Sequence, residues 1–317
     1  MENRINEARV HPAFRKAFAS LPDTPLVTME TAQAAYEQNC ELLKRYARPH
    51  DDISTVDRMI PGRLPEDPEV KVRILEKVGR TEKAPVVFYI HGGGMYLGNV
   101  ENSEGGALMA IRATDCVAVM PEYRLSWQAP YPAAIKDCYA ALCWTVEHAE
   151  ELNIDPDKII VYGVSAGGGL AAALSLLSRD LGYPKIAAQI PLQPMLDARC
   201  CTKSMQDITD LRAWNGPQNK LAWDMYLSGL EGEIPAYASP ALADDFSGLP
   251  QTYFYIGELD PMRDEAITYA QKLMEAGVIV DFRVVGGVWH AFEAAFNPMV
   301  MECIGMTNSF IKSVFDE

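Results

Sequence analysis

Apolar and polar residues follow two distinct patterns along the chain. From about residue 70 onward, short runs rich in β-branched and aromatic residues alternate with longer stretches whose apolar positions recur at helical spacing. Several short runs are almost continuously apolar, which is typical of parallel strands buried on both faces of a sheet. The runs predicted to be strands are 70–75, 85–90, 116–124, 158–164, 186–194, 251–257 and 278–285.

The stretches between these runs are predicted to be helices. They cover about 101–114, 132–150, 166–181 and 262–277, with a last helix at about 299–315. Such strand and helix repetition predicts an α/β fold with a doubly wound, mostly parallel central sheet flanked by helices. Ligand sites in such sheets lie outside the carboxyl ends of the strands, so the loops that follow strands are the places to look for chemistry.

Two regions interrupt the alternation. Residues 1–50 have a helical pattern before any strand is expected, and residues 200–235 insert a helical, aromatic segment between two strands. We expect N-terminal cap helices at 1–50 and a catalytic domain at 51–317, with a helical cap insertion at about 200–235. An insertion after the carboxyl end of a strand is well placed to cover a site. Core packing is the favoured role for its apolar cluster of Trp214, Trp223, Met225 and Tyr226.

Composition and charge narrow the class of protein. Of the 317 residues, 49% are hydrophobic and 22% charged, which is ordinary for a globular protein. The net charge of −15 repels phosphate backbones and anionic lipids, so neither nucleic acid nor a membrane is an expected partner. The N-terminus has no signal-peptide pattern, and the seven cysteines lack a short-spaced framework. We therefore expect a cytoplasmic protein with free thiols.

One predicted strand ends in a motif of nucleophilic enzymes. The sequence Gly163-Val164-Ser165-Ala166-Gly167 matches G-x-S-x-G, in which a sharp turn between strand and helix exposes the serine hydroxyl. The motif arises by chance in roughly one chain in ten of this length. It stands here between a predicted strand and a small-residue helix, as the mechanism requires. The alternative is a small-residue turn that only lets two elements pack closely.

A glycine-rich loop follows another predicted strand. Its sequence is His91-Gly92-Gly93-Gly94. Residues without side chains let backbone N–H groups converge on the oxyanion of a tetrahedral intermediate, and the N–H of Ala166 would be a further donor. The alternative, a phosphate-binding loop, is disfavoured because neither a P-loop lysine nor a G-x-G-x-x-G motif is present.

A serine nucleophile needs a base and an acid. Among the five histidines, His290 follows a late predicted strand in a loop, where the base of this architecture belongs. The acid must lie between serine and histidine in the chain. Asp260 is the favoured acid and Glu258 the alternative. Asp264 and Glu265 are expected in the first turn of the next helix, where acidic residues interact with the helix dipole.

With these residues in place, the chain resembles the hormone-sensitive-lipase-like, or bacterial type IV, esterases of the α/β-hydrolase fold. The resemblance runs from about residue 70 to the C-terminus. It implies Ser165, Asp260 and His290 as a catalytic triad and Gly93, Gly94 and Ala166 as oxyanion donors. It calls for no cofactor or metal, and it implies that the chain can form a homodimer. The motifs that carry it are "HGGG", "EYRL", "PYPAAIKDC", "GVSAGGGLAAA", "QPMLDAR", "AWDMYL", "ASPALADDFSGLP", "GELDPMRDE" and "WHAF".

Three positions depart from the pattern of the family. Val164 stands where relatives typically have aspartate, and residues 126–129 read Ser-Trp-Gln-Ala where relatives usually have Ala-Pro-Glu-His. The aspartate, glutamate and histidine side chains that relatives have at these two places are therefore absent from this sequence. The third departure is Ala291, which replaces the usual glycine after the histidine and is expected to be tolerated.

The sequence therefore predicts a serine carboxylesterase acting on short-chain acyl esters, with a small-molecule ester as its partner. The alternatives are a deacetylase or amidase acting on acetylated small molecules, and a non-catalytic small-molecule receptor. The receptor is disfavoured because His290 is present, whereas it is replaced in the receptor of this family. The residues expected to form the pocket walls are Met95, Tyr96, Tyr123, Trp214, Trp289 and Phe292.

Overall fold

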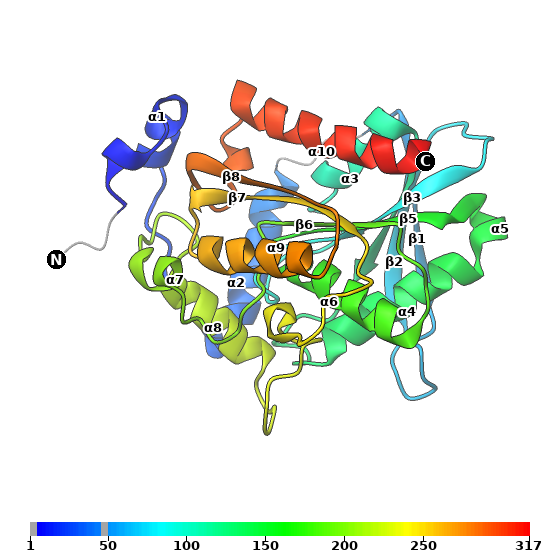
Figure 1. Ribbon diagram of the computed structural model, residues 1–317, viewed down its shortest axis with the longest axis horizontal. Helices are drawn as coiled ribbons and strands as arrows, with labels where there is room; N and C mark the ends of the chain where they lie inside the picture. Colours follow the sequence, from blue (N-terminus) through cyan, green and yellow to red (C-terminus); the bar gives the residue numbers. More distant parts are fainter. Residues whose placement is uncertain (1–4, 46–49) are drawn as a thin grey trace.

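The computed structural model, which describes residues 5–45 and 50–317, has one central sheet (Figure 1). Its eight strands within the described residues lie in the order β1-β2-β4-β3-β5-β6-β7-β8. The pairings of β1 with β2 and of β2 with β4 are antiparallel, and all the others are parallel. The predicted α/β-hydrolase architecture with a mostly parallel sheet is confirmed. The strands are β1 (Ile53–Ile60), β2 (Val70–Lys77), β3 (Ala84–Ile90), β4 (Val117–Glu122), β5 (Ile154–Val164), β6 (Ala188–Leu192), β7 (Gln251–Leu259) and β8 (Val280–Trp289).

The central strands carry the apolar runs that the sequence pattern identified. In β3 every residue from Val86 to Ile90 is buried, and in β5 every residue from Ile159 to Gly163 is buried. Consecutive buried residues point to opposite faces of a sheet, so these strands require cover on both sides.

The sequence analysis missed the edge strand β1. Most of its residues are at least partly exposed, and Asp57 pairs with Arg73 on β2 through two hydrogen bonds of 2.7 and 2.8 Å. An antiparallel edge strand that faces solvent lacks a continuous apolar run, and this is the signal by which the other strands were found.

Helices cover both faces of the sheet (Figure 1). One face packs against α3 (Gly105–Thr114) and α10 (Pro298–Asp316), and the other against α4 (Ala133–Glu147), α6 (Ala166–Leu181) and α9 (Arg263–Glu275). All five were predicted. The predicted helix at 132–150 is divided at His148, after which α5 (Ala149–Leu152) adds one more turn.

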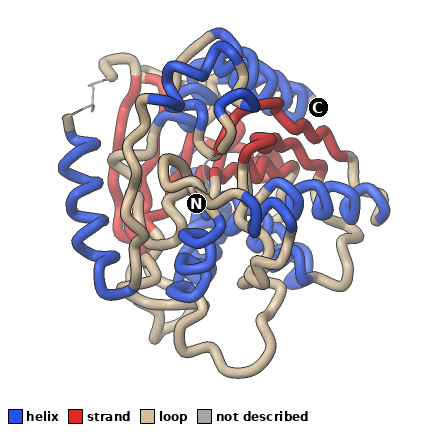
Figure 2. Tube along the Cα trace, turned by 90° about the vertical axis from the view of Figure 1, so that its left-hand side faces the viewer, coloured by secondary structure: helices blue, strands red, loops and turns tan. Residues whose placement is uncertain are grey.

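The two predicted cap regions meet at the end of the molecule where the parallel strands finish (Figures 1 and 2). They contribute α1 (Arg15–Ala19) and α2 (Met29–Lys44) from the N-terminal part, and α7 (Lys203–Asp207) and α8 (Gly216–Tyr226) from the insertion. The Gln218 side chain accepts a hydrogen bond from the Val27 N–H at 2.7 Å and donates one to its carbonyl at 3.1 Å. The predicted end of the α2 helix, beyond residue 45, lies outside the described residues.

The segment before α8 is not helical. Helix α8 begins at Gly216 because the Asn215 side chain accepts a hydrogen bond from the Gln218 N–H at 3.0 Å. An asparagine in this position caps a helix rather than extending it. Residues 210–215 therefore form an irregular stretch before α8.

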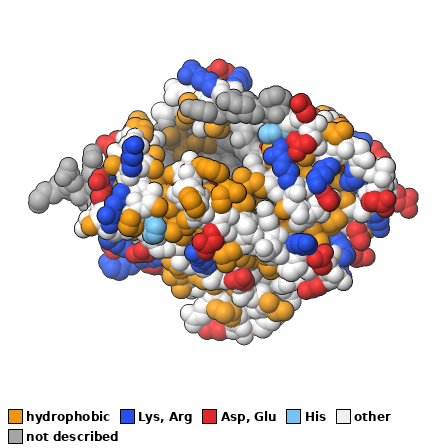
Figure 3. Space-filling view, turned by 90° about the horizontal axis from the view of Figure 1, so that it is seen from above, with side chains coloured by type: hydrophobic (Ala, Val, Ile, Leu, Met, Phe, Trp, Pro, Cys, Tyr) orange, Lys and Arg blue, Asp and Glu red, His pale blue; other side chains and the backbone are white. Residues whose placement is uncertain are grey.

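The face of the molecule covered by α10 is rich in hydrophobic side chains (Figure 3). Phe296, just before this helix, is 75% exposed, and Met301 within it is 46% exposed. The homodimer stays a prediction, as does the cytoplasmic location. No helix within residues 5–45 and 50–317 is both long enough and apolar enough to span a membrane.

Candidate active site

A strained serine connects β5 to α6. Ser165 has φ 59° and ψ −120°, a backbone conformation uncommon for a residue with a side chain. Its N–H donates to the Leu192 carbonyl at 2.8 Å, and its carbonyl accepts from the Met195 N–H at 3.2 Å. The sharp turn leaves the hydroxyl free of the helix cap, at the carboxyl edge of the sheet. This is the elbow geometry that the sequence motif predicts.

The glycines around the elbow are required by close packing. A Cβ on Gly163 would lie 2.0 Å from the Gly167 carbonyl oxygen, and a Cβ on Gly167 would lie 2.2 Å from the Ile90 carbonyl oxygen. Contacts this short do not occur between non-bonded atoms. The start of α6 is therefore pressed against the end of β3, where the glycine-rich loop begins.

Strand pairing brings the predicted acid and base together. Leu259 of β7 lies opposite Trp289 of β8, so the residues that follow each strand emerge side by side. The distance from His290 Nδ1 to Asp260 Oδ2 is 2.6 Å, and that from His290 Nε2 to Ser165 Oγ is 2.9 Å. Both Asp260 and His290 are buried. The geometry fits an imidazole that donates to the carboxylate and accepts from the serine hydroxyl.

The alternative acid, Glu258, is directed elsewhere. One of its carboxylate oxygens pairs with Arg9 at 2.9 Å, and the other accepts a hydrogen bond from the Gly287 N–H at 2.8 Å. Its side chain is 38% exposed, whereas Asp260 is completely buried. Glu258 thus ties the N-terminal segment to the strand that leads to His290.

The surroundings of His290 favour its protonated form. Burial lowers the pKa of the imidazole, but the negative charge and hydrogen bond of Asp260 act in the opposite direction, with a smaller contribution from the charge of Glu293. The net result is a pKa above the ordinary histidine value. An imidazole with a raised pKa is a stronger base for accepting the serine proton.

The glycine-rich loop lies directly beside the serine. A Cβ on Gly92 would come within 3.2 Å of Ser165 Cβ, and both Gly93 (φ 119°) and Gly94 (φ 60°) have left-handed backbone conformations. Within the part of the chain that the structure describes, the N–H groups of Gly93, Gly94 and Ala166 have no hydrogen-bond acceptor. Backbone donors left free next to a nucleophile can bind an oxyanion.

Residues 126 and 127, which differ from the family pattern, support this loop. The Ser126 hydroxyl donates to the Met95 carbonyl at 3.0 Å, and the Trp127 indole N–H donates to the Tyr96 carbonyl at 3.1 Å. The sequence analysis identified the departure but not its role. Nothing in the local pattern shows which segment such polar groups will meet across the fold.

The histidine of the glycine-rich loop is structural. His91 stacks on Tyr123 with ring centroids 4.2 Å apart, and the Tyr123 hydroxyl donates to the His91 carbonyl at 3.0 Å. Burial lowers the pKa of His91 to about 4, so its ring is neutral near neutral pH.

Val164, which departs from the family pattern beside the elbow, is half-buried and packs against the core, so a valine fits this position without a polar partner.

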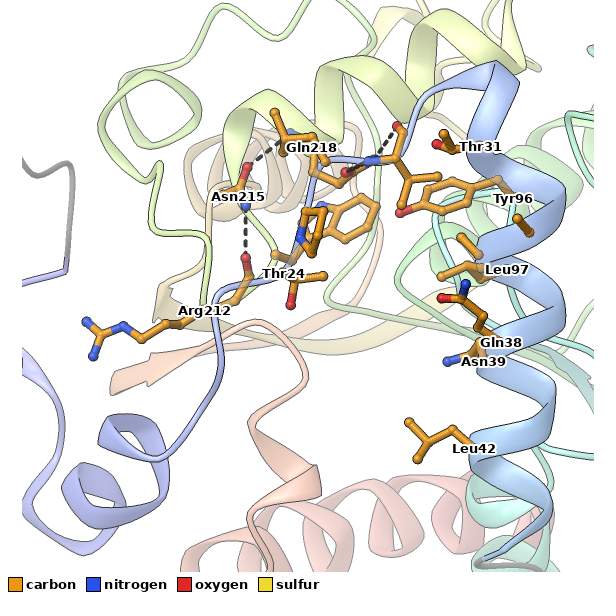
Figure 4. Close-up of a pocket in the computed structure, with 17 residues that line it drawn as sticks. Thr24, Thr31, Gln38, Asn39, Leu42, Tyr96, Leu97, Arg212, Asn215 and Gln218 are labelled. Atoms are coloured by element: carbon orange, nitrogen blue, oxygen red, sulfur yellow. Dashed lines mark hydrogen bonds between the residues drawn. The ribbon is translucent and has the colours of Figure 1, made fainter.

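A cavity of about 670 Å³ lies between α2 and the irregular stretch before α8 (Figure 4). Tyr96 and Leu97 of the glycine-rich loop line it, and so does Trp214, whose ring centroid is 6.0 Å from that of His290. Trp214 therefore stands between the cavity and His290, and neither His290 nor Ser165 is among the described residues that line the cavity. The other lining residues are Thr24, Pro25, Leu26, Val27, Thr31, Ala34, Ala35, Gln38, Asn39, Leu42, Arg212, Ala213, Asn215 and Gln218.

The remaining predicted wall residues do not line this cavity. Trp289 packs against Phe18 with centroids 4.9 Å apart, and Phe292 packs against Phe14 at 5.7 Å. Tyr123 is stacked beneath His91, and Met95 is buried at the turn of the glycine-rich loop. Trp289 and Phe292 are therefore covered by Phe14 and Phe18 of the N-terminal segment, whereas Tyr123 supports the glycine-rich loop.

Within residues 5–45 and 50–317, no group of three or more His, Cys, Asp or Glu side chains is arranged to hold a metal ion. The expectation that no cofactor is needed stays a prediction.

A mostly parallel sheet with a serine elbow, and with an acid and a base after its last two strands, defines an α/β-hydrolase. The sequence profile of a family described as the alpha/beta hydrolase fold matches residues 87–294. The chain belongs to this family and, within it, to the hormone-sensitive-lipase-like esterases.

Curated relatives carry the names of ester hydrolases. An arylesterase of Saccharolobus solfataricus is 37% identical over 72% of this chain and 74% of its own length. The carboxylesterase NlhH of Mycobacterium tuberculosis is 35% identical over 67% of this chain and 68% of its own length.

Solved structures similar to this chain also carry the names of esterases. A bacterial heroin esterase superposes with a TM-score of 0.89 at 34% identity, covering 97% of this chain and 98% of that one. A thermostable esterase from Pseudomonas putida superposes with a TM-score of 0.88 at 26% identity, covering 96% and 98%. We conclude that the chain is a carboxylic ester hydrolase.

Proposed function

We propose that the protein is a serine carboxylesterase that hydrolyses short-chain acyl esters through an acyl-enzyme. Ser165 Oγ attacks the ester carbonyl carbon while His290 Nε2 takes the hydroxyl proton. The N–H groups of Gly93, Gly94 and Ala166 bind the resulting oxyanion. The C–O bond to the alcohol then breaks, and His290 returns the proton to the departing alkoxide.

Water completes the cycle. His290 takes a proton from a water molecule, which attacks the acyl carbon, and the bond to Ser165 Oγ breaks as that oxygen recovers a proton. The products are a carboxylic acid and the free enzyme. Asp260 orients the imidazole and stabilises its protonated form in both halves of the reaction.

The single observation that carries this proposal is the continuous chain of contacts from Ser165 to Asp260. Two distances, 2.9 and 2.6 Å, connect the hydroxyl, the imidazole and a buried carboxylate. Ser165 and Asp260 belong to different strand ends and meet only through His290. Such an arrangement has a direct chemical use in activating a hydroxyl.

The cavity supports an uncharged ester as the substrate. Its volume of about 670 Å³ lies within the range of small-molecule sites. Among the described residues that line it, Arg212 is the one with a charge, and Figure 4 shows its guanidinium turned away from the cavity. That group is paired with Asp210 at 2.8 Å and Glu7 at 2.9 Å, so it is already neutralised.

The test is hydrolysis of p-nitrophenyl esters of graded acyl length. We expect kcat/KM to be highest for the shorter acyl chains, and Ser165→Ala to abolish turnover on all of them. A wild-type protein that hydrolyses none of these esters, or a fully active Ser165→Ala variant, would overturn the proposal.

A second candidate is a deacetylase of acetylated small molecules, which uses the same catalytic parts. The structural likeness to a bacterial heroin esterase favours it, because that name records a small-molecule ester as the substrate. A panel of acetate esters with alcohols of increasing size separates the two. A preference set by the alcohol, with little dependence on acyl length, would favour the deacetylase.

A further inference from the structure

A buried amide lies behind the loop that carries His290. Gln193 follows β6 and is completely buried. Its Oε1 accepts a hydrogen bond from the Ala291 N–H at 2.8 Å, and its Nε2 donates to Glu293 Oε1 at 2.6 Å. The Tyr255 hydroxyl donates to the same carboxylate oxygen at 2.7 Å. One side chain thus holds two points of the loop, the backbone of Ala291 and the carboxylate of Glu293.

The backbone at this point is in a disfavoured conformation. Ala291 has φ 59° and ψ 33°, the left-handed region that glycine adopts readily and alanine does not. Ala291 is also the residue that replaces the usual glycine of the resembling family. Gln193 itself has φ 45°, so two residues with side chains share the strain. Such conformations persist where surrounding contacts hold them in place.

We propose that Gln193 is a positioning residue that holds Ala291 in its left-handed conformation and thereby keeps His290 in line with Ser165. The inference rests on the proposed serine mechanism. Among the described residues, the Gln193 side chain makes no hydrogen bond to Ser165 and does not line the cavity, so it acts through the loop and not on the substrate.

The amide suits this task because it carries a donor and an acceptor on one rigid plane. Only one orientation of the group directs its oxygen to an N–H and its nitrogen to a carboxylate, so the two hydrogen bonds fix each other. The bond to Glu293 involves a charged acceptor, and such bonds are shorter and stronger than neutral ones. The backbone N–H of Gln193 also donates to the Tyr255 carbonyl at 3.0 Å, and this bond anchors the residue to β7.

The consequence for catalysis is a dependence of kcat on a residue outside the site. A small displacement of a catalytic group lowers the rate of the chemical step strongly, whereas substrate binding is little affected. Loss of the amide leaves Ala291 free to leave the left-handed region, and His290 Nε2 then meets Ser165 Oγ less often.

Three variants and a matched control test this proposal. Gln193→Met keeps the length of the side chain and removes both hydrogen bonds. Ala291→Gly removes the penalty of the left-handed conformation, and the double variant combines the two. The control is Gln189→Met in β6, because Gln189 is equally buried and donates to Thr252 Oγ1 at 3.0 Å, away from the loop of His290.

We expect Gln193→Met to lower kcat about tenfold with KM nearly unchanged, a factor of the size that one hydrogen bond contributes, because the two lost bonds act on His290 only through the loop. The double variant should recover about threefold or more of that loss, since glycine needs no support at this position. Gln189→Met should lower the melting temperature about as much as Gln193→Met does, while leaving kcat unchanged.

The result that overturns the proposal is a Gln193→Met variant with unchanged kcat, or one whose loss Ala291→Gly does not relieve. A loss of kcat equal to that of Gln189→Met would likewise assign Gln193 to stability alone. The low-field NMR signal of the proton between His290 and Asp260 gives an independent readout, and it should broaden or shift in Gln193→Met only. An inactive wild type would count against the proposed function and not against the positioning role of Gln193.

Discussion

The indole of Trp214 packs directly on the backbone of Gly94. A Cβ at position 94 would lie only 2.5 Å from the Cη2 atom of Trp214, and the indole N–H is held by the Asn219 side chain at 3.0 Å. A residue of the cap insertion thus touches the loop proposed to bind the oxyanion. A displacement of Trp214 in the cap therefore changes the packing around Gly94 in this loop.

Gly94→Ala should lower kcat by about a hundredfold, because both the clash with Trp214 and the left-handed φ displace an N–H group that is proposed to bind the oxyanion. The measurement is steady-state hydrolysis of a p-nitrophenyl ester. Gly182→Ala is the control, since Gly182 has a similar φ of 67° with no atom within 4 Å of the added Cβ. Equal losses of kcat in both variants would contradict the role given to Gly94.

Ser126→Ala should lower kcat by a few-fold, because the variant loses one of two hydrogen bonds to the Met95 carbonyl that support the glycine-rich loop. Ser175→Ala, which removes a hydrogen bond of 2.9 Å to the Ala171 carbonyl inside α6, should leave kcat unchanged. If Ser126→Ala affects only the melting temperature, the loop does not depend on this contact.

The pH profile of kcat/KM should have its acidic limb above pH 6.5, because the pKa of His290 is raised and only the neutral imidazole accepts a proton. Glu293→Gln removes a negative charge that raises this pKa, so the limb should move to lower pH. Asp224→Asn removes an equal charge at an exposed ion pair with Lys220 and should not move the limb. A shift to higher pH in Glu293→Gln would contradict the electrostatic account.

Glu265→Gln should become more stable relative to wild type as the pH rises. Burial raises the pKa of Glu265 well above its ordinary 4.5, while two backbone N–H groups, from Leu196 and Asp197, donate to the side chain. The contribution of Glu265 to the stability of the wild type is therefore fully present below pH 4.5, and it is lost as the pH rises from 4.5 through the raised pKa of the folded protein. Urea unfolding at pH 5 and pH 8 measures the difference between the two proteins, and a gap that stays constant with pH would contradict the prediction.

Ala35→Trp should fill the cavity and raise KM for bulky esters while changing kcat/KM for an acetate ester little. Ala35 lines the cavity from α2. Gln33→Trp, on the exposed side of the same helix, is the control for adding an indole. If both variants discriminate between esters equally, the cavity is not the substrate site.

Much of the site could be predicted because its parts are local. The elbow at Ser165 and the glycines at 163 and 167 form one turn whose steric requirements are written in five consecutive residues. Asp260 was preferred over Glu258 because it directly precedes Pro261, where the next helix was expected to start, and the structure puts Asp260 against His290. The pocket walls were harder, since Trp289 and Phe292 lie beside His290 in sequence yet face the N-terminal helices.

The sequence by itself determined the alternation of strands and helices, the strained turn at Ser165 and the order of the catalytic residues, because backbone sterics and hydrophobic period act over a few neighbouring residues. The tertiary structure alone decided which distant groups touch. It brought Ser126 to Met95 and Gln193 to Ala291, and it placed Trp214 between the cavity and His290. Contacts of this kind depend on how whole elements pack, and no local pattern records the partner that a side chain will meet across the fold.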